Sequence, residues 1–368
     1  METLKVLAVA DPAVMAYVDQ KLTDKFPAKV KMDVFPWSEY YSTMMQVFEG
    51  TAYYDIIMVA GHLWKRDFVE KGYLAPISYE EEDILPVIAK EMKFAGKQYL
   101  SPSFCDGHII VYRKSVIKEV LGKEFGDIVT PKEYFEAAQK LSDAGHFIAM
   151  KADESEIFTD ALPFLRMDGM DVYDATTELI QCEQKEIVNG LEKYVDLKKF
   201  AFIDTDTYGN VEVAKKLQSK EAAMGVTWSG QMGTVMNEDC IEKEDLGFAT
   251  FSTAWNVTWS FAISSTSRNI VLAEELLQFL RSKEIDQKAG SVSGAPVRKD
   301  SYLSFVETYP WYHCQLAMFE NATLLPNLLK AGDKFGVLYH QIALAFAGEK
   351  SPKEAMIDAK HEIMKLEA

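Results

Sequence analysis

The sequence predicts an α/β protein of two lobes, and three observations carry this prediction. Short apolar runs alternate with segments of helical periodicity along most of the chain. The 368 residues exceed the usual size of a single hydrophobic core, and a hydrophobic content of 48% is ample for two. Two apolar segments, 98–114 and 255–263, also look long enough to leave one lobe and enter the other.

The N-terminal part of the chain is predicted to alternate strands with helices. Strands are expected at residues 5–9, 30–35 and 54–59. Asp11 and Pro12 follow the first strand as an N-cap and a first-turn proline, and Ser38 is positioned to cap the helix after the second strand. Strands separated by helices pair in parallel through right-handed crossovers, so parallel pairing is expected here.

Segment 98–114 is predicted to be an interrupted strand between the lobes. Pro102 removes a backbone donor and Gly107 weakens the strand, before an apolar run resumes at residues 109–112. Asp106 lies in the interruption, where an acid is commonly a turn former, although an acid at a lobe junction also suggests a ligand contact. From this segment alone, both interpretations of Asp106 stay open.

The rest of the chain continues the alternation. Capping boxes at 130–133 and 351–354 predict the starts of two helices. Further strands are expected at residues 147–150, 222–227, 246–251 and 255–263, and further helices at 186–195, 211–217 and 273–280. The strand at 255–263 is too long for one small lobe and predicts a second crossing, while Gly294 and Pro296 punctuate a third.

The composition argues against several classes of protein. A formal charge of −17 with no local basic patch opposes binding to nucleic acids and to anionic lipid surfaces. The four cysteines are far apart and include no Cys-x-x-Cys pair, which indicates free, mostly buried thiols rather than a zinc site or a disulfide framework. No apolar run approaches the roughly 18 residues that a membrane span needs.

Enzyme and metal motifs are missing or incomplete. There is no glycine-rich dinucleotide loop, Walker loop or Gly-x-Ser-x-Gly elbow. Residues 204–209 begin like a calcium loop, but Tyr208 and Lys215 stand where oxygen ligands are needed. The six histidines include no His-x-x-x-His pair. We therefore expect a protein that is not an enzyme and that uses no cofactor or metal.

Candidate ligand-binding side chains come at the ends of the predicted strands, where loops converge in open α/β sheets. Such positions hold five of the six tryptophans, and only Trp311 lies elsewhere. A tryptophan taken alone is usually a packing residue, but clustered aromatic rings beside carboxylates suit a sugar, whose C–H face stacks on indole. Together with Arg298 near the third crossing, the candidates are Asp11, Trp37, His62, Trp64, Asp106, Asp153, Trp228, Trp255, Trp259 and Arg298.

A series of fragments, in this order and spacing, resembles one known family. The fragments are residues 54–59 with 71–76, 99–112, 130–134, 221–224, 261–263 with the helix that follows, 294–297 and 319–322. Through them the chain resembles the extracytoplasmic solute-binding proteins of ABC importers, in the carbohydrate-binding, maltose-binding-protein-like branch. The likeness spans nearly the whole sequence.

The resemblance implies a two-lobed type II periplasmic-binding-protein fold, with a ligand cleft between the lobes and a three-segment hinge that closes on the ligand. The implied N-terminal lobe is 1–107 and 259–297, the C-terminal lobe is 108–256 and 302–368, and the crossings lie near 104–110, 255–262 and 296–301. Asp11, Trp64 and Asp106 match positions that contact sugar in the family, which favours the ligand interpretation of Asp106. Trp228 matches with a displacement of one or two residues.

The resemblance also implies a receptor that captures a mono- or oligosaccharide and delivers it to a membrane permease. Indoles would stack on the sugar and polar groups would bind its hydroxyls, from Trp64, Trp228, Trp255, Trp259, Asp11, Asp106 and Arg298. We expect a monomer outside the cytoplasm, as a cell-surface lipoprotein or in a periplasm, with an export signal that this sequence does not include. Two alternatives stay open. The acidic balance would suit a cationic solute such as a polyamine, and paired carboxylates would suit a glycoside hydrolase, although no convincing acid pair is evident.

Overall fold

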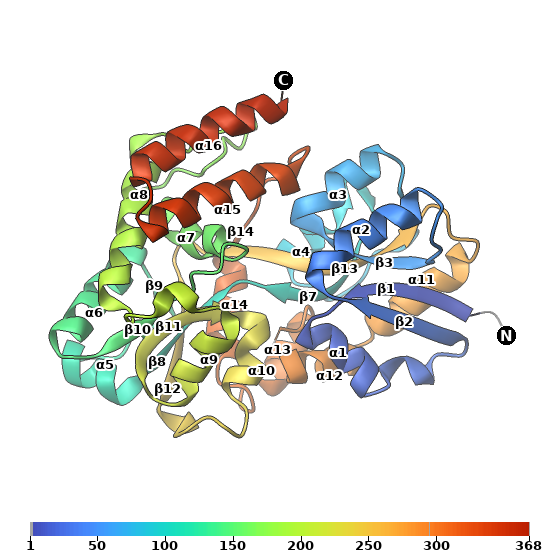
Figure 1. Ribbon diagram of the computed structural model, residues 1–368. Helices are drawn as coiled ribbons and strands as arrows, with labels where there is room; N and C mark the ends of the chain where they lie inside the picture. Colours follow the sequence, from blue (N-terminus) through green and yellow to red (C-terminus); the bar gives the residue numbers. More distant parts are fainter. Residues whose placement is uncertain (1–2, 294, 368) are drawn as a thin grey trace. The chain divides into compact units, whose positions relative to one another are not determined.

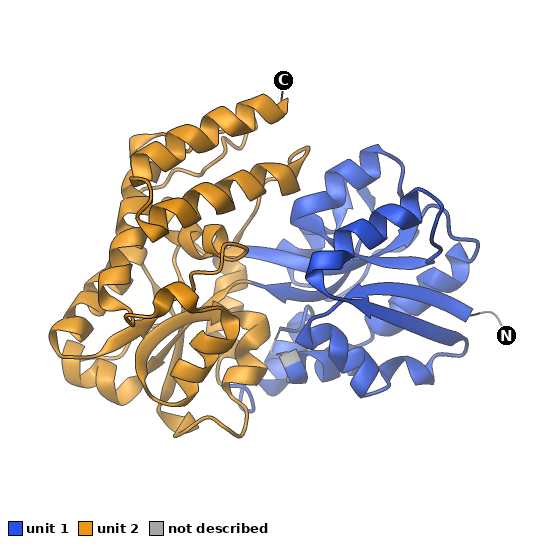
Figure 2. Cartoon of the chain, viewed as in Figure 1, with its two compact units in different colours: residues 1–106, 256–309 blue, residues 107–255, 310–368 orange. Residues whose placement is uncertain are grey.

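The structure is a computed structural model that describes residues 3–293 and 295–367 (Figure 1). The chain divides into two compact units (Figure 2). Unit 1 comprises residues 1–106 and 256–309, and unit 2 comprises residues 107–255 and 310–368. The chain passes from one unit to the other at residues 106–107, 255–256 and 309–310. Each unit is therefore assembled from segments that are far apart in the sequence.

Unit 1 alternates strands with helices along its first segment, as the apolar periodicity predicts. Its strands are β1 (Thr3–Val9), β2 (Lys29–Phe35), β3 (Ile56–Ala60), β4 (Leu74–Ala75), β5 (Lys93–Phe94), β6 (Lys97–Gln98), β7 (Ser101–Asp106) and β13 (Trp255–Ser264), which begins at the last residue of the first segment of unit 2. Its helices are α1 (Pro12–Asp19), α2 (Trp37–Phe48), α3 (Gly61–Glu70), α4 (Pro86–Glu91), α11 (Ile270–Leu280), α12 (Lys283–Ser293) and α13 (Lys299–Phe305), with a 3-10 turn η1 (Leu22–Lys25).

The main sheet of unit 1 runs in the order β13-β3-β1-β2, and β4 and β7 also pair with β13. β1 pairs in parallel with both β2 and β3, which confirms the expectation for the first three strands. β13 is antiparallel to β3, β4 and β7, so the sheet is mixed rather than purely parallel. All five residues of β3 are buried, as an apolar run in a central strand requires.

The starts of the first two helices show how well short sequence signals predict where a helix begins. The Asp11 carboxylate accepts a hydrogen bond from the Ala13 amide at 2.8 Å, which confirms the predicted N-cap of α1. The predicted cap at Ser38 is wrong. α2 begins one residue earlier, at Trp37, so Ser38 already lies in its first turn. The position of Trp37 is therefore set by a helix rather than by a loop.

Unit 2 carries its own sheet, in the order β10-β11-β8-β12-β9. The strands of this sheet are β8 (His108–Arg113), β9 (Ile128–Val129), β10 (Phe147–Ala149), β11 (Ala222–Trp228) and β12 (Leu246–Phe251), and unit 2 also contains β14 (Thr323–Leu324) outside this sheet. Its helices are α5 (Lys114–Leu121), α6 (Pro131–Asp143), α7 (Ile157–Leu165), α8 (Lys185–Asp196), α9 (Asn210–Gln218), α10 (Met232–Val235), α14 (Tyr312–Asn321), α15 (Ala331–Ala347) and α16 (Pro352–Glu367). Its 3-10 turns are η2 (Leu197–Phe200), η3 (Thr205–Thr207), η4 (Ser229–Gln231) and η5 (Lys243–Asp245). β8 is antiparallel to β11 and β12, while β10 with β11 and β12 with β9 are parallel.

Both predicted capping boxes are present in unit 2. The Thr130 hydroxyl oxygen accepts the Glu133 amide at 3.1 Å, and the Glu133 carboxylate accepts the Thr130 amide at 2.8 Å, which starts α6. The Ser351 hydroxyl and the Glu354 carboxylate make the same reciprocal contacts before α16, at 3.2 and 3.0 Å. These two helix starts were predictable because the signal spans only four residues.

The first passage between the units is the segment that the sequence marks as an interrupted strand. β7 and β8 are separated by Gly107 alone. A Cβ atom on Gly107 would lie 2.5 Å from the Met318 sulfur and 2.8 Å from the Trp255 carbonyl oxygen, both in unit 2. Glycine is required here by the close approach of its neighbours rather than by a flexible turn.

The third passage between the units lies at residues 309–310, later than the expected range of 296–301. α13 remains part of unit 1, where the Ser301 hydroxyl donates a hydrogen bond of 2.6 Å to the buried Asp286 carboxylate. Gly294, which was expected to punctuate this crossing, lies outside the described residues.

The expectations drawn from composition can be compared with the described part of the chain. The four cysteines are free and buried, as predicted. Between residues 3–293 and 295–367, we find no helix whose length and apolar character would let it span a membrane. The same residues contain no group of three or more His, Cys, Asp or Glu side chains arranged to hold a metal ion.

Candidate ligand-binding site

Three of the predicted tryptophans meet in unit 1. Trp37 begins α2, Trp64 lies in the first half of α3, and Trp259 lies on β13. The rings of Trp37 and Trp64 stack, with centroids 5.6 Å apart and planes 22° apart. Trp259 packs edge-on against Trp37 at 5.7 Å and against Trp64 at 6.1 Å. These are favourable aromatic geometries, so two helices and a strand hold one fixed aromatic cluster.

Two aromatic rings next to one another on α2 are exposed to solvent at this cluster. Trp37 is 48% exposed, whereas Trp64 is only 8% exposed. Tyr41, one turn after Trp37, is 47% exposed and its ring centroid lies 5.5 Å from that of Trp64. Trp64 therefore supports two aromatic rings that face solvent, and exposed apolar surface held in place in this way is typical of a binding surface.

The predicted polar residues of unit 1 have different surroundings. Burial lowers the pKa of His62 to about 3, so this half-buried imidazole is neutral near pH 7. The Asp11 carboxylate caps α1, as described above, and is half-buried. Asp106 is the last residue of β7, is half-buried, and lies opposite Val257 of β13. Asp106 is thus at the end of a strand, where the sequence analysis placed it.

Arg298 lies among other charged residues of unit 1. Its guanidinium donates to the Arg281 carbonyl oxygen at 2.9 Å, and its Nε lies 3.6 Å from the Asp83 carboxylate. Its backbone amide donates to Asp286 at 3.2 Å. These contacts are structural, and a role for Arg298 in ligand binding stays a prediction.

Sequence reasoning missed a buried carboxylate next to the strand that carries Trp259. Glu91 ends α4, is 4% exposed, and accepts hydrogen bonds of 3.3 Å from the Thr258 amide and the Asn256 side chain. The Lys65 ammonium donates to the Glu91 carbonyl oxygen at 2.6 Å. Burial raises the pKa of Glu91 to about 7, against the opposing effects of Thr258 and Lys65. The partners on β13 are about 165 residues away along the chain, so no local pattern could reveal this site.

The other two predicted tryptophans meet in unit 2, around a histidine. Trp228 ends β11, Trp255 begins β13, and His108 begins β8. The His108 ring centroid lies 4.9 Å from each indole, and the two indoles meet edge-to-face at 5.1 Å. Trp255 is 1% exposed and His108 is 3% exposed, whereas Trp228 is only half-buried. Trp228 is therefore the ring of this cluster that reaches solvent.

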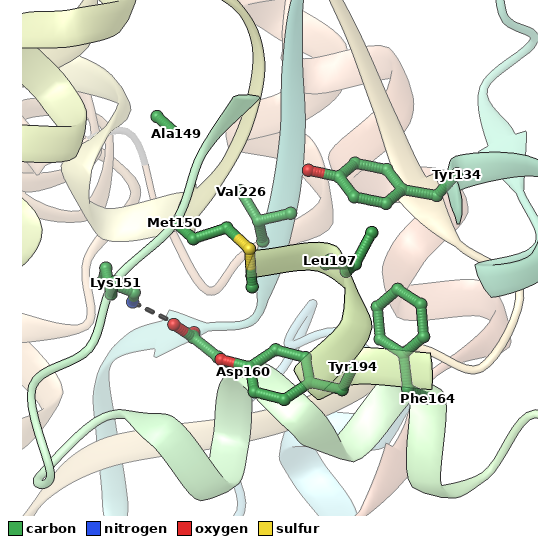
Figure 3. A pocket seen from close by; sticks show the side chains of 9 residues that line it. All are labelled: Tyr134, Ala149, Met150, Lys151, Asp160, Phe164, Tyr194, Leu197 and Val226. Carbon is green, nitrogen blue, oxygen red and sulfur yellow. Dashed lines mark ion pairs between the residues drawn. The ribbon is translucent and has the colours of Figure 1, made fainter. Parts of the chain in front are cut away.

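A network of charged side chains lies against Trp228. The Lys151 ammonium is 3.1 Å from the Asp160 carboxylate and 3.2 Å from the Glu156 carboxylate. The same Asp160 oxygen is 2.9 Å from Nε2 of His108. Figure 3 shows the ion pair of Lys151 and Asp160 beside a small cavity. Sequence reasoning singled out none of these four residues as a ligand-binding candidate, only their neighbour Asp153, because a lysine or glutamate before a helix carries no distinctive signal.

The charged groups of this network shift one another's pKa values against the effect of burial. Burial by itself would lower the pKa of Lys151, but Asp160 and Glu156 outweigh that effect and raise the pKa. Burial would raise the pKa of Asp160, but Lys151 and His108 lower it below its usual value. Burial lowers the pKa of His108 in spite of Asp160. At neutral pH the network therefore contains a charged Lys151, a charged Asp160 and a neutral His108.

Two cavities within unit 2 have no predicted tryptophan among their lining residues. The cavity in Figure 3 has a volume of about 20 Å³ and is lined by Lys151, Asp160, Tyr134 and Tyr194 among others. That volume suits a single water molecule and is far too small for a sugar. A larger depression of about 290 Å³ lies beside α5 and α6, and none of the ten predicted residues lines it.

The remaining predicted residue of unit 2 is in a turn. The Asp153 carboxylate accepts the Ser155 amide at 2.9 Å and the Ser155 hydroxyl at 2.8 Å, before α7 begins. Asp153 is exposed. Trp311, which the sequence analysis set apart, packs against Phe248 and Tyr312 in unit 2. The five predicted tryptophans thus form two clusters, one of three rings in unit 1 and one of two rings in unit 2.

Two α/β units, three connecting passages and an aromatic cluster with a partly exposed indole in each unit define a class of two-lobed binding proteins. A model of the bacterial extracellular solute-binding protein family matches residues 9–287, which is most of the chain. The chain belongs to this family. The family resemblance noted in the sequence is therefore confirmed.

Similar solved structures support the same fold. The maltose-bound MalE3 of T. maritima is 19% identical, with a TM-score of 0.85 and 99% of each chain covered. An ABC transporter solute-binding protein of Thermotoga lettingae, bound with α-D-tagatose, is 18% identical, with a TM-score of 0.84 and the same coverage. One of Agrobacterium vitis with bound D-mannitol is 19% identical, with a TM-score of 0.80, and covers 99% of this chain and 98% of that chain. The predicted two-lobed type II fold is confirmed.

Proposed function

We propose that this solute-binding protein captures a carbohydrate and delivers it to the membrane permease of an ABC importer. The observation that carries the proposal is the pair of tryptophan clusters, each with one indole that keeps exposed surface. Indole faces stack on the C–H faces of a sugar ring and leave its hydroxyls to polar neighbours. The maltose, tagatose and mannitol bound by structures of the same fold support a sugar or polyol as the solute.

In this proposal the exposed Trp37 ring and the half-buried Trp228 ring contact the sugar directly. Trp64, Trp255 and Trp259 hold them in place or extend the stacking surface. Asp11, Asp106, Asp153 and Arg298 are the proposed partners of hydroxyl groups, and His62 supports the cluster of unit 1. The two units are the proposed lobes, which close on the ligand by hinge motion at the three passages.

Membership of the family supports the remaining parts of the proposal. The protein acts outside the cytoplasm, as a surface lipoprotein or in a periplasm, binds as a monomer, and releases its solute unchanged to the permease. A receptor of this kind needs binding and release but no catalytic group. Reaction products after prolonged incubation with an oligosaccharide would contradict the non-enzymatic role.

A thermal-shift panel tests the choice of solute. The panel consists of maltose, acarbose, D-tagatose, D-mannitol, ribitol and cycloalternan, with spermidine as the cationic comparison. A solute at about a hundred times its Kd should stabilise the protein by roughly 2.7 kcal/mol, because it binds only the folded state. Isothermal titration then gives the Kd of each hit. A shift with spermidine and none with any saccharide or polyol would overturn the carbohydrate assignment.

Two single variants test the two clusters. Trp37→Ala and Trp228→Ala each remove a partly exposed ring, so each should weaken the Kd for the best solute by roughly 30-fold, or about 2 kcal/mol. Phe147→Ala is the matched control, because Phe147 is 46% exposed and its ring packs on Phe202 rather than on a predicted tryptophan. Unchanged affinity in both tryptophan variants would show that the solute binds elsewhere.

A further inference from the structure

Four side chains contact the Trp228 indole and restrict its orientation. Its indole N–H donates a hydrogen bond to the Glu156 carboxylate, and the Lys151 ammonium lies 5.1 Å from the centre of its ring. On other sides, His108 and Trp255 pack against the ring at 4.9 and 5.1 Å. An indole that is only half-buried would ordinarily be free to change rotamer, so these contacts restrict its orientation.

Glu156 and Lys151, which contact the Trp228 ring, are themselves held in place by further polar contacts. One Glu156 oxygen takes both the indole N–H and the Lys151 ammonium, and the other accepts the Asn210 amide at 3.1 Å. The Asn210 oxygen in turn accepts a hydrogen bond of 3.2 Å from Lys151. Asp160 provides the second carboxylate for the ammonium, at 3.1 Å. Four elements therefore meet at this point: the ends of β10 and β11 and the starts of α7 and α9.

Stability alone does not explain this arrangement. The Lys151 side chain is fully buried, and burying an ammonium with carboxylates costs desolvation energy that their attraction only partly offsets. An apolar side chain of similar size in place of Lys151 would pack against the Trp228 ring without that cost. A network that is costly to bury, but that links four elements through Lys151, Glu156, Asn210 and Trp228, is best suited to fixing geometry.

We propose that Glu156 and Lys151 are positioning residues that preset the orientation of Trp228 for the incoming solute. This inference rests on the proposed function, in which Trp228 stacks on the sugar. A ring that is already oriented loses less freedom on binding, so the affinity is higher than for a mobile ring. Glu156 acts through Trp228 and not through its own contact with the solute.

A double-mutant cycle tests this route of action. Glu156→Ala should weaken the Kd for the best saccharide of the panel by about 3- to 10-fold, the effect of one side chain whose freedom is lost on binding. In the Trp228→Ala background the same substitution should change the Kd by less than about 2-fold, because the ring it orients is gone. Equal losses in both backgrounds would mean that Glu156 contacts the solute itself, which overturns the inference.

Two further variants separate positioning from general damage. Glu156→Gln keeps an oxygen that can accept the indole N–H, so it should retain more affinity than Glu156→Ala. Glu154→Ala is the matched control, because Glu154 is exposed and pairs with His340 in unit 2, and it should leave the Kd unchanged. The melting temperature of each protein without solute shows whether the variant is folded.

A measurement without solute keeps the inference testable even if no saccharide binds. With 15N-labelled tryptophan, the Trp228 indole N–H signal is assigned as the one that Trp228→Phe removes. It should exchange slowly with water in the unmodified protein, and Glu156→Ala should make it exchange faster and shift it. An unchanged indole signal in Glu156→Ala would overturn the positioning role. Failure of every saccharide to bind, with the indole signal behaving as expected, would overturn only the proposed function.

Discussion

Glu91 is a buried carboxylate whose protonation is coupled to the stability of unit 1. Its oxygens face the start of β13, where the Thr258 amide and the Asn256 side chain donate to it. Burial is the largest influence on this group and raises its pKa to about 7, which Thr258 and Lys65 only partly oppose. Lys65 itself uses its ammonium to bond backbone carbonyl oxygens at 2.6 and 3.1 Å.

The stability of the protein should therefore depend on pH through Glu91. A carboxyl with a pKa of about 7 in the folded state and about 4.5 in the unfolded state binds its proton more tightly when folded. Its contribution to stability is fully present below pH 4.5 and is lost as pH rises to 7. Relative to Glu91→Gln, which does not titrate, the unmodified protein should lose about 2 kcal/mol of unfolding free energy between pH 5 and pH 8.

Urea unfolding of both proteins at pH 5 and pH 8 measures this difference. The comparison is needed because burial also raises the pKa of Glu81 to about 7, and that group titrates equally in both proteins. Glu80→Gln is the control, since Glu80 is exposed and pairs with Lys93 at the surface. A difference between Glu91→Gln and the unmodified protein that does not change with pH would contradict the prediction.

The residues that sequence reasoning identified correctly are those whose partner is close in the chain. Asp11 and Ala13, or Thr130 and Glu133, are separated by two or three residues, so composition and spacing reveal the contact. Glu156 and Trp228 are 72 residues apart, and only the sheet of unit 2 brings them together. The register of the strands in this sheet decides whether the two residues meet, and no short sequence pattern reveals that register.

The same distinction applies to whole elements. Helices with one apolar face, such as α6 and α8, were predicted because polar residues alternate with buried ones at helical spacing. α7 was missed. All nine of its residues are buried and Pro163 lies inside it, so it has neither a polar face nor a continuous helical signal. Its helical form depends on the elements that surround it.

The packing of α7 against α8 depends on one glycine. A Cβ atom on Gly190 of α8 would lie 2.3 Å from the Phe164 carbonyl oxygen and 2.8 Å from its carbonyl carbon, both backbone atoms of α7. Backbone cannot move aside as a flexible side chain can, so Gly190→Ala must separate the two helices. We expect a loss of about 1–3 kcal/mol in unfolding free energy, measured by urea or thermal unfolding.

Gly336→Ala is the matched control for this prediction. Gly336 lies in α15, is exposed, and has no neighbouring atom within 4 Å of an added Cβ. Alanine has the higher helix propensity, so this variant should gain about 0.5–1 kcal/mol. If both glycine variants were equally stable, the close approach of α7 and α8 would not be a constraint on the sequence.

At the scale of the whole molecule, chain length and two long apolar segments predicted two lobes, but which segments belong to each lobe followed from the family resemblance. Periodicity identified the long strand at β13 and the interruption at Gly107, but neither shows by itself which segments share a core. The third crossing was expected at 296–301, before the passage at 309–310, because Pro296 is an ordinary loop signal and α13 after it is short. Its attachment to unit 1 depends on contacts with α12, which no local signal encodes.

The distribution of aromatic residues between the units leads to a prediction about the whole protein. Each unit holds its own cluster, with Trp37 exposed in one and Trp228 half-buried in the other. A solute that contacts both units stabilises only arrangements in which both rings reach it, so binding shifts the population toward closed forms. Small-angle X-ray scattering should therefore give a smaller radius of gyration when the best saccharide of the panel is present at saturation.

The same two variants distinguish closure from simple binding to one unit. At a solute concentration that saturates the unmodified protein but not the weakened variants, Trp37→Ala and Trp228→Ala should each keep the larger radius, because either loss removes one side of the contact. Phe147→Ala should contract as the unmodified protein does. A saccharide that binds with full occupancy and leaves the radius unchanged would show that it contacts a single unit, and the hinge mechanism would then be wrong even though the solute assignment stands.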